Sequence, residues 1–144
     1  MTLKFEKPGK KEKVSKTPQK AKISVLLTKS QRLKVFNKFD GCCAYCSEEI
    51  DFSNFHVEHV IPKRSFKNPK DADFWDNLRP SCSPCNLRKG PLSVERFRSE
   101  LVRDIYQLKR DSPKFRLLIK YGLISISDFP VSFYFERYKK GERK

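Results

Sequence analysis

The chain has few acidic residues and no long apolar run. Its 144 residues include 17 aspartates and glutamates against 32 lysines and arginines, a formal net charge of +15. Such an excess on a small chain favours a polyanionic partner, and nucleic acid is the obvious one. No apolar run approaches the ~20 residues of a membrane-spanning helix, and no signal-peptide core follows Met1. We therefore expect a cytoplasmic protein that binds no membrane.

The length and the 38% of hydrophobic residues fit one domain with a modest core. We place this domain at residues 23–135, between a basic arm at 1–22 and a basic tail at 136–144. The arm is rich in lysine and also contains proline and glycine, so we expect it to be disordered. It either solubilises the protein or adds salt-dependent affinity for a duplex, and we favour a contribution to DNA binding.

Cysteine is sparse but unevenly placed. Four of the five cysteines form two Cys-x-x-Cys pairs: Cys43 with Cys46, and Cys82 with Cys85. The spacing and the missing signal peptide favour reduced thiolates over disulfides. Two such pairs suit one tetrahedral, structural zinc ion without an open coordination position. Cys42 is left over and is interpreted as inert packing, although a site that uses Cys42 in place of Cys43 remains the alternative.

Alternating polar and apolar residues predict a hairpin between the two cysteine pairs. Residues 56–61 alternate in this way and are ended by Pro62, which indicates a strand. A loop over 63–76 then leads to a second strand over 78–81.

A short helix is predicted directly after this hairpin. Ser83 can cap it, Pro84 suits its first position and Gly90 suits its end. The helix is expected to carry Cys85, Asn86 and Lys89.

Further elements are predicted on either side. Hydrophobic spacing indicates a short helix over 28–39. A helical extension over 92–121 begins at the cap residue Ser93, restarts at a Ser-Pro pair and ends before Gly122. The apolar and aromatic run at 131–135 predicts a late strand.

Three polar residues between and beside the cysteine pairs stand outside the sulfur set: Glu58, His59 and Asn86. A carboxylate and an amide oxygen suit a hard divalent cation, and an imidazole suits proton transfer. With the basic charge, this combination favours a metal-dependent nuclease.

Four blocks of sequence resemble the zinc-containing HNH endonucleases. They are Cys43-Ala44-Tyr45-Cys46, Glu58-His59-Val60-Ile61-Pro62, Asn77-Leu78-Arg79-Pro80 and the run from Cys82 to Gly90. Order, spacing and residue type agree over residues 41–90. The resemblance implies an α+β fold: a ββα-metal core with a four-cysteine structural zinc, which we expect to be flanked by helices and the late C-terminal strand.

The resemblance also implies roles. Glu58 and Asn86 would bind the catalytic ion, Mg²⁺ or Mn²⁺, which would bridge a phosphate oxygen and the leaving 3′ oxygen. His59 would be the general base that activates water, leaving a 5′-phosphate and a 3′-hydroxyl. Asn77 would hydrogen-bond backbone and orient His59. Phosphate binding is expected from Arg79, Arg88 and Lys89.

Two residues depart from the commonest family pattern. The acid is Glu58 where aspartate is more usual, and the last motif residue is Asn86 rather than histidine. Strict strand alternation would also send Glu58 and His59 to opposite faces, so the strand must twist or end near His59. His56 shares a face with Glu58, but we interpret it as exposed or structural. Trp75 is expected in the core, with base stacking as its alternative.

The competing interpretation is a non-catalytic zinc-ribbon module that binds nucleic acid within a larger assembly. It explains the cysteines and the charge but gives no reason for the acid-histidine pair. We therefore favour an endonuclease that acts on DNA in preference to RNA. Because little of the chain is left for recognition, specificity would come from the long loop, from the helices after Pro91, from a homodimer or from a protein partner.

Overall fold

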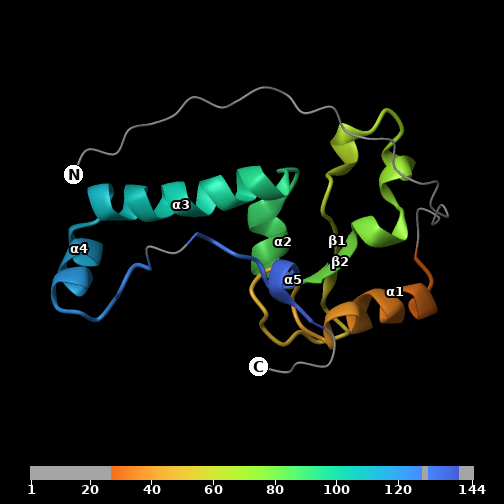
Figure 1. The fold of residues 1–144 in the computed structure, drawn as a ribbon, viewed down its shortest axis with the longest axis horizontal. Helices are drawn as coiled ribbons and strands as arrows, with labels where there is room; N and C mark the ends of the chain where they lie inside the picture. The colour runs from red at the N-terminus through yellow and green to blue at the C-terminus, as the bar shows by residue number, and fades with distance from the viewer. Residues whose placement is uncertain (1–26, 128–129, 140–144) are drawn as a thin grey trace.

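The computed structural model describes residues 27–127 and 130–139, so the basic arm predicted at 1–22 lies outside the described residues. Within this part, helices surround one antiparallel hairpin (Figure 1). The elements are α1 (Lys29–Phe36), β1 (His56–His59), β2 (Leu78–Ser81), α2 (Ser83–Lys89), α3 (Val94–Asp111), α4 (Pro113–Lys120) and α5 (Tyr134–Arg137).

The hairpin pairs His56 with Ser81 and His59 with Leu78. β1 ends at His59, earlier than the predicted end at residue 61. The reason is local: the N–H of Val60 still donates to the backbone oxygen of Asn77 at 3.0 Å, but the N–H of Asn77 donates back to Phe74 at 2.9 Å, and the N–H of Ile61 donates to the Asn77 side chain. The two-way pairing of the ladder therefore ends at His59.

Helix α2 follows the hairpin directly, so the predicted strand-loop-strand-helix order is confirmed. The predicted cap Ser83 is wrong: the helix begins at Ser83, and its N-cap is Cys82, whose side chain makes no capping hydrogen bond. Pro84 is therefore the second helical residue, still in the first turn, where a missing N–H costs nothing. Gly90 ends the helix with a φ of 46°, a value that favours glycine. In the predicted loop, residues 63–65, 69–72 and 75–77 form short 3₁₀ turns.

Two apolar clusters hold these elements together, and β2 leads from one to the other. The first gathers around the cysteine pairs and contains Cys43, Tyr45, Cys82, Phe97 and Phe133. The second joins α1 to the hairpin and contains Val35, Phe55 and Leu78. Because Leu78 begins β2 and Cys82 follows it, the strand connects the two clusters. Trp75 packs against the second cluster, half-buried.

The late strand predicted at 131–135 is wrong. In the described part of the chain, residues 131–133 belong to no strand, and α5 begins at Tyr134. The N–H groups of Tyr134 and Phe135 instead donate to the backbone oxygens of Tyr45 and Ala44, at 3.0 and 2.7 Å. The aromatic residues that favour a strand serve here to cover the first cysteine pair. Two side-chain contacts also hold this segment. Glu136 forms an ion pair with Arg98 of α3, and the hydroxyl of Tyr138 donates a hydrogen bond to Asp40.

The other helices are close to those predicted. Thr28 caps α1, which ends at Phe36 and continues as a 3₁₀ turn to Phe39. Ser93 caps α3, which runs away from the hairpin to α4 (Figure 1). None of the described helices combines the length and the apolar character needed to cross a membrane.

Candidate metal and catalytic site

The four cysteines of the two pairs form a cluster. The sulfur atoms of Cys43, Cys46, Cys82 and Cys85 all lie within 4.8 Å of one another. Those of Cys46 and Cys82 are 3.8 Å apart. A tetrahedral zinc ion with Zn–S bonds of about 2.3 Å spaces its sulfurs about 3.8 Å apart, so the donor set fits structural zinc. Cys42 lies outside the cluster, so Cys43 is the sulfur that belongs to it.

The thiols of this cluster influence one another strongly. The hydrogen bond from Cys85 lowers the pKa of Cys43 to about 4, against the opposing effect of burial. Burial raises the pKa of Cys46 to about 11, and the hydrogen bond to Cys43 raises that of Cys85. One thiolate therefore suppresses ionisation of its neighbours. A divalent cation bound among them would reverse that effect and favour four thiolates.

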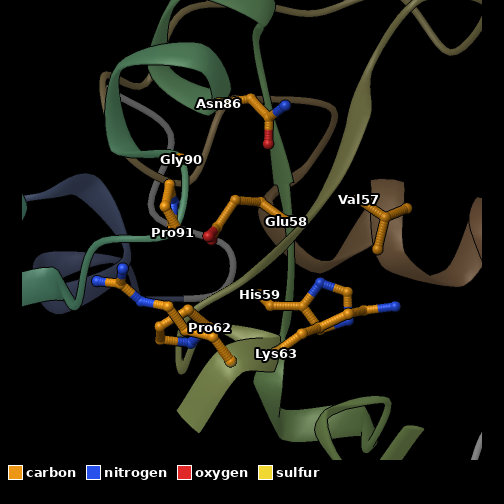
Figure 2. A pocket seen from close by; sticks show the side chains of 9 residues that line it. Val57, Glu58, His59, Pro62, Lys63, Asn86, Gly90 and Pro91 are labelled. Atoms are coloured by element: carbon orange, nitrogen blue, oxygen red, sulfur yellow. The ribbon is translucent and has the colours of Figure 1, made fainter. Parts of the chain in front are cut away.

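A pocket opens where β1 ends, and Figure 2 shows the side chains around it. Its lining combines acidic, basic and neutral polar groups: Val57, Glu58, His59, Pro62, Lys63, Arg64, Asn86, Gly90 and Pro91. Glu58 and His59 leave the strand in opposite directions, as strand alternation requires (Figure 2). They still line one pocket, because β1 ends at His59.

Glu58 is buried and held at both carboxylate oxygens. Its Oε1 pairs with the ammonium of Lys89, and its Oε2 accepts a hydrogen bond from the hydroxyl of Tyr45. Burial, followed by the charge of Glu58, raises the pKa of Tyr45, so this hydroxyl keeps its proton and donates. Tyr45 lies between Cys43 and Cys46, so the first cysteine pair positions one of the two groups that hold the carboxylate.

The remaining donors on the pocket side fit a hard divalent cation. Each carboxylate oxygen of Glu58 has two lone pairs, so a cation can still bind opposite the groups that hold it. Figure 2 shows the Asn86 side chain directed toward Glu58. Among the described residues, the cysteine cluster is the single group of three or more metal-binding side chains. An ion at Glu58 and Asn86 would therefore complete its shell with water, as Mg²⁺ commonly does.

His59 faces a different partner. Its Nε2 lies 2.6 Å from Oδ1 of Asp73, a buried residue in the loop between the strands. The ammonium of Lys63 is 3.2 Å from the same oxygen.

Asn77 ties this loop to the end of β1. Its side-chain oxygen accepts from the N–H of Ile61 at 2.7 Å. Its Nδ2 donates to the oxygens of Ile61, at 3.0 Å, and Ala72, at 2.9 Å. These are the backbone hydrogen bonds expected of a residue that holds the loop.

The three basic residues expected to bind phosphate do not line this pocket: Arg79, Arg88 and Lys89. Lys89 has no exposed side-chain surface. Arg88 pairs with Asp104 of α3. Arg79 is half-buried, donates to the oxygen of Asp76 at 2.8 Å, and has a pKa lowered by burial.

Sequence reasoning missed four residues of this site: Tyr45, Lys63, Arg64 and Asp73. Lys63 and Arg64 directly follow Pro62 of the second motif, so their position in the sequence could have identified them as site residues. Tyr45 lies inside the first cysteine pair. Asp73 lies outside the four motif blocks, and nothing in the local sequence distinguishes it from Asp71. His56 is exposed and does not line the pocket.

Comparison with known proteins agrees with this geometry. Residues 43–92 match the model of the HNH endonuclease family. A stretch of 61 residues is 34% identical to Septu protein PtuB of Bacillus thuringiensis and covers 41% of this chain and 23% of that protein. The chain thus spans less than a quarter of the length of this relative. From the match and from the hairpin, helix and cysteine cluster within it, residues 43–92 belong to the HNH endonuclease family.

Proposed function

We propose that the protein is a divalent-metal-dependent endonuclease that hydrolyses DNA phosphodiester bonds to a 5′-phosphate and a 3′-hydroxyl. The observation that carries this proposal is that Glu58, His59 and Asn86 line one pocket together with Lys63 and Arg64. A proton acceptor, two oxygen donors for a cation and two cations for phosphate meet there. The net charge of +15 supports a polyanionic substrate.

In this proposal His59 takes the proton from the water that attacks phosphorus in line with the leaving 3′ oxygen. Glu58 and Asn86 would hold Mg²⁺ or Mn²⁺. When bound, this ion would neutralise the negative charge that develops on the phosphate and on the leaving oxygen. Lys89 and Tyr45 fix the Glu58 carboxylate from behind. A site held this rigidly spends little energy on reorganisation during the reaction.

We assign substrate phosphate binding to Lys63 and Arg64, in place of the residues expected from the sequence. Lys63 is half-buried, Arg64 is exposed, and both line the pocket that contains His59. Two cations in one pocket suit the scissile phosphate and a neighbouring phosphate of the same strand. Lys63 also pairs with an acidic side chain, Asp73, but Arg88 and Lys89 do not line this pocket.

We also propose that a second protein contributes to specificity. The outer parts of α3, α4 and the turn after them expose large apolar side chains: Val102, Tyr106, Leu108, Leu117, Leu118 and Tyr121. Such side chains gather at protein interfaces. A net charge of +15 disfavours contact between two copies, so the chain alone should be a monomer by light scattering at low salt.

The test of the nuclease is cleavage of supercoiled plasmid by protein that is stripped of loosely bound metal and retains zinc. We expect nicking that requires Mg²⁺ or Mn²⁺ and that is abolished in His59→Ala. The matched control is His56→Ala, which removes an exposed imidazole from the same strand and should cleave normally.

Each other outcome has a clear meaning. DNA binding without cleavage, with zinc bound, would contradict the nuclease and indicate the binding module instead. Loss of cleavage in His56→Ala would show that His56 belongs to the catalytic site.

A further inference from the structure

The loop between the two strands brings a carboxylate to the proposed base. Asp73 is 6% exposed, and its Oδ1 is 2.6 Å from His59 Nε2. The second oxygen of the carboxylate, Oδ2, is buried and has no hydrogen-bond partner among the residues that the structure describes. A buried carboxylate is costly unless a partner compensates its charge, and the imidazole and Lys63 Nζ are the groups that meet it.

We propose that Asp73 is the positioning residue for His59, which makes Nδ1 the nitrogen that accepts the proton from water. This inference rests on the proposed nuclease function. An ionised carboxylate is an acceptor only, so the hydrogen bond requires the proton of the neutral ring on Nε2. The lone pair then lies on Nδ1. Asp73 thereby selects both the tautomer and the angle of the ring.

Asn77 holds the backbone next to both members of the His59–Asp73 pair. One of its Nδ2–H groups binds the oxygen of Ala72, the residue before Asp73. The other Nδ2–H and Oδ1 bind Ile61, two residues after His59. A single buried amide thus fixes the backbone beside the carboxylate and beside the imidazole.

The proton balance of the step is simple. Water gives one proton to His59 Nδ1, and its oxygen forms a bond to phosphorus as the bond from phosphorus to the 3′ oxygen breaks. The 3′ oxygen leaves with the electron pair of that bond and takes a proton from solvent water to become the 3′-hydroxyl. The ring becomes an imidazolium with protons on both nitrogens, stabilised by the ionised Asp73. Asp73 takes no proton, and the imidazolium later loses its proton to solvent.

The kinetic test compares Asp73→Asn and Asp73→Ala with the matched control Asp71→Asn, which removes an exposed carboxylate from the same loop. Both Asp73 variants should lower kcat about 100-fold because the ring is misoriented, and KM should change much less, because Arg64 remains in place although Lys63 loses its partner. Asp71→Asn should match the wild type. Circular dichroism and zinc content confirm folding.

The second readout is independent of turnover. The chain has two histidines, so ¹⁵N-labelled imidazoles give two resolvable ring systems. His59 should show a protonated Nε2 that is protected from exchange in the wild type and in Asp71→Asn, and that loses this protection in Asp73→Ala. The exposed His56 serves as the internal reference.

The outcomes separate the two proposals. If the wild type cleaves, His59→Ala does not, and both Asp73 variants keep a normal kcat, the positioning role is overturned while the nuclease stands. A reduced kcat with an unchanged His59 Nε2–H signal overturns it as well. If the wild type itself fails to cleave with Mg²⁺ or Mn²⁺, the proposed function fails, and the positioning role fails with it.

Discussion

The ammonium of Lys89 and the carboxylate of Glu58 form an ion pair that is almost completely removed from solvent, with side chains 0% and 5% exposed. Lys89 also donates to the backbone oxygen of His59 at 2.8 Å. The last turn of α2 is thereby bonded to two consecutive residues of β1. The pair supports the site from inside, where no substrate reaches it.

Breaking this pair should be costly. Lys89→Met leaves a buried carboxylate without its cation, and we expect a loss of about 3–5 kcal/mol in the free energy of unfolding. Urea denaturation of the zinc-loaded protein measures it, with the exposed Lys34→Met as control. The double variant Glu58→Gln/Lys89→Met should recover much of the loss. Equal stability of the single and double variants would contradict a buried pair.

Zinc content should follow cluster membership. Cys43→Ser removes a sulfur of the cluster and should lower the zinc bound per chain and the melting temperature, whereas Cys42→Ser should change neither. Elemental analysis and thermal unfolding are the measurements. If instead Cys42→Ser loses zinc, the cluster assignment is wrong.

Chelation of zinc should also abolish cleavage. Tyr45 and Lys89, which hold Glu58, lie in the two segments that carry the cysteines.

Asn77→Ala should destabilise the loop. It removes three hydrogen bonds and leaves buried backbone groups unpaired, so we expect a loss of about 2–3 kcal/mol in the free energy of unfolding. Asn68→Ala is the control, since it removes an exposed cap of a 3₁₀ turn and should cost about 1 kcal/mol. Denaturant unfolding measures the stability loss of each variant. Equal losses in the two variants would argue against a role of Asn77 in holding the loop.

Phosphate binding can be assigned by salt dependence. Arg64→Met should weaken DNA binding and lower the slope of log affinity against log salt by about one, as expected for one lost phosphate contact. Arg88→Met should leave the slope nearly unchanged, because that guanidinium pairs with Asp104. Fluorescence anisotropy in a salt series measures both. If instead Arg88→Met lowers the slope and Arg64→Met leaves it unchanged, Arg88 is the phosphate ligand.

The contact of the C-terminal segment with α3 should weaken in acid. The hydrogen bond from Arg98 lowers the pKa of Glu136 below its ordinary value. A depressed folded-state pKa contributes stability that is present above the unfolded pKa, about 4.3, and is lost as the pH falls through the folded value. The stability difference between wild type and Glu136→Gln should therefore shrink below about pH 4 in urea titrations, and a constant difference would exclude the contact.

Local signals in the sequence determined the cysteine pairs, the hairpin, α2, α3 with its cap Ser93, and the group of Glu58, His59 and Asn86. Each of these depends on spacing along a strand or a helix, or on capping residues next to the element, so the chain itself carries the information. The family resemblance at 41–90 depends on the same short segments.

Tertiary structure alone decided three matters. Residues 131–135 have strand-forming side chains, but their backbone bonds to the first cysteine pair instead of a strand, and strand propensity cannot specify a partner. Lys89 became a buried counterion because α2 packs with that side chain over Glu58. Asp73 reached His59 because a loop closed by Asn77 brings together residues with no periodic relation in sequence. Contacts of this kind depend on which elements meet, and local sequence does not encode that.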